Sequence, residues 1–140
     1  MMADALRVVL VDDEELVRSG LRLLLSNAPD IEVVAEASNG RDAVATVLDA
    51  QPDVVLMDIR MPVMDGIAAV EKILSVHAVP IIMLTAFDTD SFILRALRAG
   101  AAGFLLKSTP PESLMAAVRA AAAGQPLLSP GVVDKLVSMQ

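Results

Sequence analysis

The 140-residue sequence contains no cysteine, no tryptophan and no tyrosine. Without cysteine, the chain can form neither a disulfide framework nor a thiolate metal site. Aromatic residues make up only 2% of the sequence, so we expect an aliphatic core and no stacking platform for single-stranded nucleic acid. The lack of cysteine also fits a cytoplasmic protein, and that is the location we expect.

Positively charged residues are scarce as well. The chain has 11 lysines and arginines against 18 aspartates and glutamates, which gives a formal net charge of −7. Such a chain repels polyanions on average. We therefore expect that this segment binds neither nucleic acid nor an anionic membrane by itself.

Long hydrophobic runs are also missing. No apolar run reaches the about 18–20 residues that a membrane span requires. The first residues, Met1–Ala5, lack the cationic start and the apolar stretch of a signal peptide. We expect no membrane-associated segment.

What the sequence does contain is a regular alternation of two patterns. Hydrophobic residues make up 55% of the 140, enough for one domain with a substantial core. Five short apolar runs alternate with longer stretches in which apolar residues recur at helical spacing. The runs are Leu6–Val11, Ile31–Ala37, Asp53–Met57, Pro80–Leu84 and Ala102–Leu106. The first, third and fourth are apolar almost throughout, as in strands buried on both faces of a parallel sheet.

Local signals mark several helix ends. The residues Thr109–Glu112 read Thr-Pro-Pro-Glu, which predicts a capping box with proline at the first helical position. Gly100 and Gly124 are suited to end the fourth and fifth helices.

Five strand–helix units predict right-handed crossovers and an open sheet with helices on both faces. We therefore expect an α/β fold: a doubly wound, flavodoxin-like (βα)5 arrangement with five parallel strands in the order 2-1-3-4-5. The last segment, Gln125–Gln140, carries two prolines and then a short apolar pattern. We expect a linker or an extra helix there.

Polar residues stand where such a sheet places its site, beyond the carboxyl ends of the strands. Asp12 and Asp13 follow the first strand, Asp58 ends the third, Thr85 ends the fourth and Lys107 follows the fifth. Because the first and third strands are neighbours in the predicted order, the three carboxylates should converge. Crowded carboxylates repel one another unless a cation lies among them, and an oxygen-only ligand set suits Mg²⁺.

This set of residues also suits phosphoryl transfer. A carboxylate beside a metal ion can attack a phosphoryl group to give an aspartyl phosphate. The reaction needs mainly positioning and neutralisation of charge. Lys107 can supply one positive charge, and the Thr85 hydroxyl can donate to a phosphoryl oxygen.

The sequence resembles CheY-like receiver domains of response regulators. The matching stretches occur in order, each at the end of its own strand: Asp12-Asp13, Met57–Gly66, Thr85-Ala86 and Phe104–Lys107. The resemblance covers about residues 6–123. It implies that Asp58 accepts a phosphoryl group from a sensor histidine kinase.

The resemblance also implies a role for the neighbouring residues. Asp13 would bind Mg²⁺ directly, Asp12 mainly through water, and Asp58 and the backbone carbonyl of Arg60 would be further ligands. Lys107 would pair with the phosphoryl group.

A switch is the expected consequence of phosphorylation. By the resemblance, the Thr85 hydroxyl would move toward the phosphoryl group and the ring of Phe104 would turn inward. This change would alter the face formed by the fourth helix, the fifth strand and the fifth helix, and would favour a homodimer.

The end of the chain resembles the linker of NarL/LuxR-type regulators, in Gly124–Pro130. Residues 1–124 would then be the receiver domain, and residues 125–140 would lead toward a C-terminal output domain outside this chain. That domain would be a helix-turn-helix, and DNA would be bound only through it. The whole protein would regulate transcription.

The same residues also allow other interpretations. Asp12 and Asp13 alone could simply cap the first helix. A phosphatase with an aspartyl-phosphate intermediate would need a second aspartate two residues after Asp58, where this chain has Arg60. A flavodoxin-like cofactor carrier would need a hydroxyl-rich phosphate loop where this chain has Asp12–Glu15. We therefore expect a phosphorylation-dependent switch and not an enzyme acting on other substrates.

Overall fold

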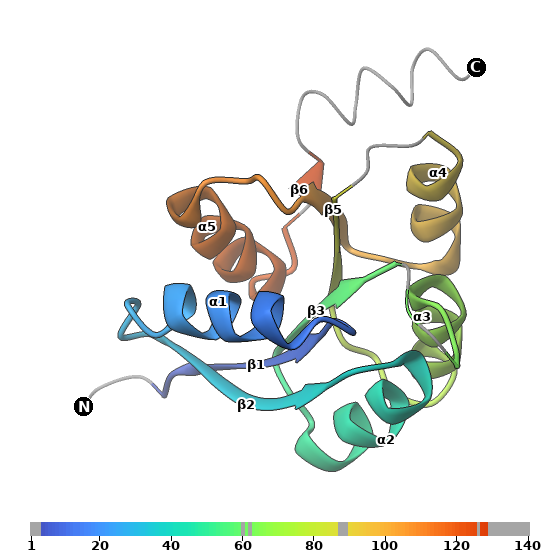
Figure 1. Cartoon of the computed structure of the whole chain (residues 1–140), viewed down its shortest axis with the longest axis horizontal. Coiled ribbons are helices and arrows are strands. Elements are labelled where there is room, and N and C mark those ends of the chain that lie inside the picture. Colours follow the sequence, from blue (N-terminus) through green and yellow to red (C-terminus); the bar gives the residue numbers. More distant parts are fainter. Residues whose placement is uncertain (1–3, 60, 62, 87–89, 126, 129–140) are drawn as a thin grey trace.

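The computed structural model of the chain describes residues 4–59, 61, 63–86, 90–125 and 127–128. Within them lies one parallel sheet with the strand order β2-β1-β3-β4-β5-β6 (Figure 1). The strands are β1 (Leu6–Val11), β2 (Ile31–Ala37), β3 (Val54–Asp58), β4 (Ile81–Thr85), β5 (Gly103–Leu106) and β6 (Leu127–Leu128). The predicted doubly wound fold and the predicted order of its five strands are confirmed, and a short sixth strand is added.

Five helices cover the two faces of this sheet (Figure 1). They are α1 (Glu15–Leu25), α2 (Gly40–Ala50), α3 (Gly66–Leu74), α4 (Asp90–Ala99) and α5 (Pro111–Ala122). Helices α1 and α5 pack on one face, and α2, α3 and α4 pack on the other. The sheet is thus covered on both sides, as parallel sheets usually are.

The core consists of two aliphatic layers that the sheet separates. Side chains alternate along each strand, so Val9 and Val11 face α2–α4 whereas Val8 and Leu10 face α1 and α5. Every residue of β3 and of β4 is buried. This burial is the reason that those strands read as apolar almost without interruption.

Glycines close two helices as the sequence predicts. Gly100 follows α4 with a φ of +110°, and Gly124 follows α5 with a φ of +76°. Both angles lie in the left-handed region, which glycine adopts without steric cost.

The capping box predicted at Thr109–Glu112 is wrong. Helix α5 begins at Pro111, and its N-cap is Pro110, which makes no side-chain capping hydrogen bond. Thr109 lies one residue too early to cap, and its N–H instead donates to the Leu106 carbonyl over 2.9 Å. Because Pro110 precedes another proline, its backbone is extended, with a φ of −58° and a ψ of 148°, so the helix begins at Pro111 and the N-cap is Pro110 instead of Thr109.

The C-terminal segment, for which a linker or an extra helix is predicted, contains the short strand β6. Residues 127 and 128 pair in parallel with Gly103 and Phe104 of β5. Residues 129–140, in which the extra helix was the alternative, lie outside the described residues. Among the helices that the structure describes, none is long and apolar enough to cross a membrane.

Candidate functional site

The predicted site residues meet at the carboxyl end of the sheet. Asp58 is the last residue of β3, Thr85 is the last of β4, and Lys107 comes directly after β5. The strands are in register at this end, since Asp58 pairs with Leu84 and Thr85 with Leu106. These three residues, from separate parts of the sequence, are therefore neighbours at the carboxyl end of the sheet.

Three carboxylates converge there as predicted. Asp12, Asp13 and Asp58 each offer an oxygen atom, and these atoms lie within 4.8 Å of one another. Asp12 and Asp58 are buried, with 2% and 7% of their surfaces exposed, whereas Asp13 is exposed. A cluster of oxygen donors that is half buried and half open suits a hard divalent cation such as Mg²⁺, which keeps several waters.

Lys107 bridges two of these carboxylates. Its Nζ lies 2.6 Å from Oδ2 of Asp12 and 3.4 Å from Oδ2 of Asp58. Burial by itself would lower the pKa of Lys107, but the two carboxylates outweigh burial and raise it. The ammonium group therefore stays charged at neutral pH and partly offsets the repulsion within the cluster.

Asp58 is in an environment that disfavours its charge. Its pKa is raised because the carboxyl group is buried, and the charge of Asp12 adds to the effect, although Lys107 acts against it. The Ile59 N–H donates to Oδ1 over 2.9 Å and fixes the orientation of the carboxylate. The group is held in place and yet is short of positive charge, so a cation bound beside it would be stabilised.

The loop after β3 is packed tightly against the acceptor. The Gly66 N–H donates to the Ile59 carbonyl over 2.7 Å, and a Cβ on Gly66 would lie only 2.2 Å from the carbonyl oxygen of Asp58. Val63 in this loop has a φ of +70°, which a β-branched residue rarely adopts. The close packing of Gly66 against Asp58 and Ile59 therefore fixes the main chain at the acceptor. The carbonyl of Arg60, a predicted metal ligand, lies outside the described residues.

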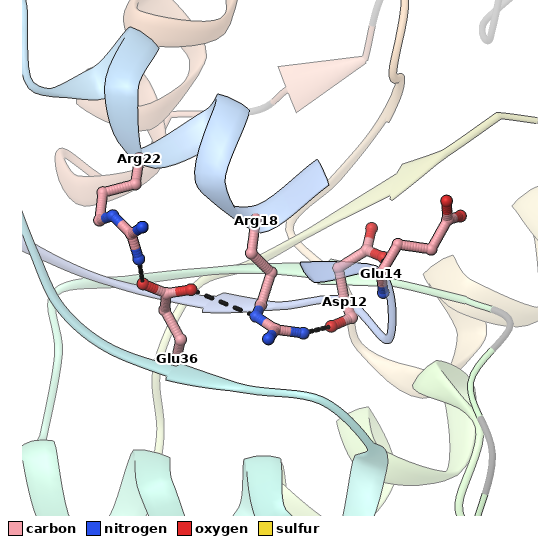
Figure 2. Close-up of polar contacts among 5 residues, drawn as sticks. All are labelled: Asp12, Glu14, Arg18, Arg22 and Glu36. Carbon is pink, nitrogen blue, oxygen red and sulfur yellow. Dashed lines mark hydrogen bonds and ion pairs between the residues drawn. The ribbon is translucent and has the colours of Figure 1, made fainter. Parts of the chain in front are cut away.

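Asp12 is anchored through both its side chain and its backbone. Its Oδ1 accepts from the Glu14 N–H over 2.9 Å, and its own N–H donates to the Ala37 carbonyl over 3.1 Å. Arg18, from the second turn of α1, donates from Nη1 to the Asp12 carbonyl over 2.6 Å (Figure 2). The structure thus brings Arg18 to this site, a position that the sequence pattern does not predict.

Thr85 and Phe104 lie on neighbouring strands. Phe104 pairs with Met83, two residues before Thr85, so the side chains of Phe104 and Thr85 are on the same face of the sheet. Both residues are buried, and the ring of Phe104 packs in the core layer beneath α2–α4. The Thr85 carbonyl accepts from the Lys107 N–H over 2.7 Å, which ties the end of β4 to the residue after β5.

The comparison with known families agrees with this geometry. The sequence model of one protein family, the response regulator receiver domain, matches residues 8–119 of the chain. The chain belongs to the response regulator receiver family.

The relatives of this receiver domain are transcriptional regulators. It is 43% identical over 141 residues to the "Uncharacterized transcriptional regulatory protein YxjL" of Bacillus subtilis, with 99% of this chain covered. It is 42% identical over 134 residues to the transcriptional regulatory protein LiaR of the same species, with 95% covered. The chain spans 64% of the length of both relatives.

Solved structures show the same likeness. A two-component response regulator of the LuxR family from Aurantimonas sp. SI85-9A1 superposes on this receiver domain with a TM-score of 0.90 and 34% identity. The match covers 97% of this chain and 98% of that chain. The predicted resemblance is confirmed, and the phosphatase and the flavodoxin-like carrier are not favoured.

Proposed function

We propose that this receiver domain accepts a phosphoryl group on Asp58, with Mg²⁺ held by Asp12, Asp13 and Asp58. The observation that carries the proposal is the cluster of three carboxylates within 4.8 Å of one another, bridged by Lys107. Asp13, being exposed, would be the direct ligand, and buried Asp12 would act mainly through water. The Arg60 carbonyl remains a proposed further ligand.

The residues of the chain have distinct tasks in this transfer. A carboxylate oxygen of Asp58 attacks phosphorus, and the bond between phosphorus and the donor's leaving group breaks. Lys107 is already 3.4 Å from Oδ2 of Asp58, so it can pair with the phosphoryl oxygens as they arrive. Mg²⁺, when bound, supplies further positive charge toward those oxygens.

The test is the intact mass of the protein after incubation with acetyl phosphate and Mg²⁺. We expect a gain of one phosphoryl group that requires the metal, and none in Asp58→Asn or Asp58→Ala. The matched control is Asp49→Asn, which removes an exposed carboxylate of α2 and should be labelled like the wild type. Normal labelling of Asp58→Ala would refute the assignment of the acceptor.

The wider role that we propose is a switch in a two-component system. The donor would be a sensor histidine kinase, and the output would be transcription, through a C-terminal DNA-binding helix-turn-helix domain. The names of YxjL and LiaR, and the greater length of both proteins, support this proposal. Residues 1–124 would be the receiver domain and residues 125–140 its link to that output domain, in the cytoplasm. The chain would assist only its own phosphorylation and dephosphorylation and would not be an enzyme in the wider sense.

Thr85 and Phe104 are the proposed switch pair. Phosphorylation adds about −1.5 to −2 charges and strong acceptor oxygens at Asp58. The Thr85 hydroxyl would move toward these oxygens, and Phe104 would occupy the space behind it. Since the ring is buried in this structure, the switch requires a second arrangement in which the ring faces outward. Moving such an equilibrium from 1:99 to 99:1 takes about 5.5 kcal/mol of preference for one state.

Sedimentation with and without beryllofluoride tests this coupling. We expect the wild type to form homodimers when activated. Thr85→Ala should still accept phosphate at Asp58 but should lose the shift in self-association. Thr46→Ala, a half-buried threonine of α2, is the control and should dimerise normally. If Thr85→Ala dimerises as well as the wild type, Thr85 is not the coupling residue.

A further inference from the structure

Arg18 links α1, the turn after β1 and β2 at a point next to the carboxylate cluster (Figure 2). Its Nη1 donates to the Asp12 carbonyl over 2.6 Å, and its Nε donates to Oε1 of Glu36 over 3.2 Å. Only 16% of its side-chain surface is exposed. The guanidinium is thus held between two acceptors and has little freedom to leave them.

The carbonyl that Arg18 contacts belongs to the peptide group joining Asp12 to Asp13. A peptide group is planar, so fixing its oxygen also fixes the direction in which the chain enters Asp13. The other contacts of Asp12 described above, with Glu14, Ala37 and Lys107, involve its side chain and its N–H. The contact from Arg18 therefore constrains the one part of this turn that both carboxylates share.

Glu36 holds the guanidinium in place from the other side. It lies in β2, with 23% of its side-chain surface exposed, and it also accepts from Nη1 of Arg22. Arg22 is more open, at 52% exposed, and its guanidinium pairs with Glu36 on the side away from Asp12 (Figure 2). The two arginines therefore share one partner and differ in the contact with the Asp12 carbonyl.

We propose that Arg18, oriented by Glu36, is a positioning residue for the metal ligands Asp12 and Asp13. The inference rests on the proposed Mg²⁺ site. Arg18 touches neither the phosphoryl group nor the metal, and it acts by holding the Asp12–Asp13 peptide group in the orientation that presents both carboxylates. Removing a group that orients metal ligands in this way commonly weakens metal binding by about 10–100-fold.

The direction in which Mg²⁺ affinity changes when Arg18 is replaced distinguishes a positioning role from a purely electrostatic one. If Arg18 acted only through its positive charge, its removal would tighten Mg²⁺ binding, because a cation near a cation site is repulsive. If Arg18 positions the ligands, its removal must weaken Mg²⁺ binding. The two explanations predict opposite changes in one measurement.

The experiment is a calorimetric titration of the whole chain with Mg²⁺. Arg18→Met keeps the apolar stem and loses the donor, and we expect it to bind Mg²⁺ about 10-fold more weakly or worse. Arg18→Lys keeps the charge and one possible donor but not the planar fork, so its affinity should fall between those of the methionine variant and the wild type. Arg22→Met is the matched control, since it loses a pair with Glu36 and leaves the Asp12 carbonyl contact in place.

A second readout distinguishes positioning from a general loss of activity. The Mg²⁺ concentration for half-maximal labelling by acetyl phosphate should rise in Arg18→Met by the same factor as the dissociation constant. The labelling rate at saturating Mg²⁺ should stay close to that of the wild type.

Several outcomes would overturn the proposal. Binding of Mg²⁺ by Arg18→Met that is as tight as in the wild type, or tighter, would reject it, and so would an equal weakening of Mg²⁺ binding in Arg22→Met. Should Arg18→Met fail to fold, Arg18→Lys decides, and binding equal to the wild type would reject the positioning role. If the wild type itself binds no Mg²⁺ and gains no phosphoryl group, the proposed function fails, whereas normal behaviour of both wild type and Arg18→Met rejects only this inference.

Discussion

Among single residues, Asp58 has the environment with the clearest thermodynamic consequence. Its pKa lies above the ordinary value of 3.8, chiefly because the carboxyl group is buried. A group whose pKa is raised on folding contributes stability below the pKa of the unfolded chain. That contribution is lost as the pH rises through the folded-state pKa. At neutral pH, the charge on Asp58 therefore costs stability in the metal-free protein.

Replacing this charge should stabilise the metal-free chain. In the presence of a chelator at about pH 7, we expect Asp58→Asn to raise the free energy of unfolding by about 1 kcal/mol, an ordinary size for one substitution. The gain should shrink as the pH falls through the folded-state pKa of Asp58, because protonation removes the same charge from the wild type. Urea unfolding, monitored by circular dichroism, measures the free energy of unfolding of the wild type and of Asp58→Asn at each pH.

Added Mg²⁺ provides the control for that measurement. A ligand that binds only the folded state stabilises it, so Mg²⁺ should raise the stability of the wild type more than that of Asp58→Asn. A variant that is less stable than the wild type at neutral pH without metal would contradict the assigned cost of the Asp58 charge.

The sequence predicted the site residues unequally. Asp12, Asp58 and Lys107 could be found because each stands at the end of an apolar strand, and parallel strands end at the same edge. Arg18 and Glu36 could not, because each reads as an ordinary charged residue of an amphipathic element. Their contact depends on how α1 crosses β2, and local periodicity carries no information on that crossing.

Among the elements, the loop between β3 and α3 can keep its conformation only with glycine at position 66. A Cβ at Gly66 would meet two backbone atoms, the Asp58 carbonyl oxygen at 2.2 Å and the Ile59 Cα at 2.9 Å. Backbone cannot move aside as the end of a flexible side chain can. The start of α3 can therefore approach the acceptor strand only if residue 66 has no side chain.

Two alanine substitutions should have opposite effects on stability. Gly66→Ala should lower the free energy of unfolding by about 1–3 kcal/mol, the usual cost of overpacking, and should slow labelling of Asp58. Gly20→Ala is the matched control, because Gly20 lies inside α1 with nothing within 4 Å of its Cβ position. It should raise stability by about 0.5–1 kcal/mol, through the better helix propensity of alanine. Equal stability of the two variants would contradict the packing argument.

Elements were predicted best where the pattern was long. The bounds of β1 and β2 agree with the predicted runs, and β3, β4 and β5 each begin one residue later than predicted. The pair Leu127-Leu128 was missed because two residues are too few to show a period. Its pairing comes from the turn after α5, which returns the chain to the free side of β5.

At the scale of the whole molecule, the acidic character of the chain sets what it can bind. With a formal net charge of −7, the 140 residues should repel the phosphate backbone of DNA. We expect no shift of DNA mobility by this chain, either unmodified or activated with beryllofluoride. A sequence-specific shift would show an output function within the chain itself.

One border of the sheet ends in β2, and the other ends in β6. On the other side, β6 takes up the hydrogen-bonding groups at Gly103 and Phe104. A chain cut after Gly124 would leave those groups open, and an open, apolar strand edge recruits strands from other molecules. The choice of where to truncate this protein is therefore also a choice about aggregation, because a boundary beyond Leu128 leaves the two-residue strand β6 at that border in place of β5.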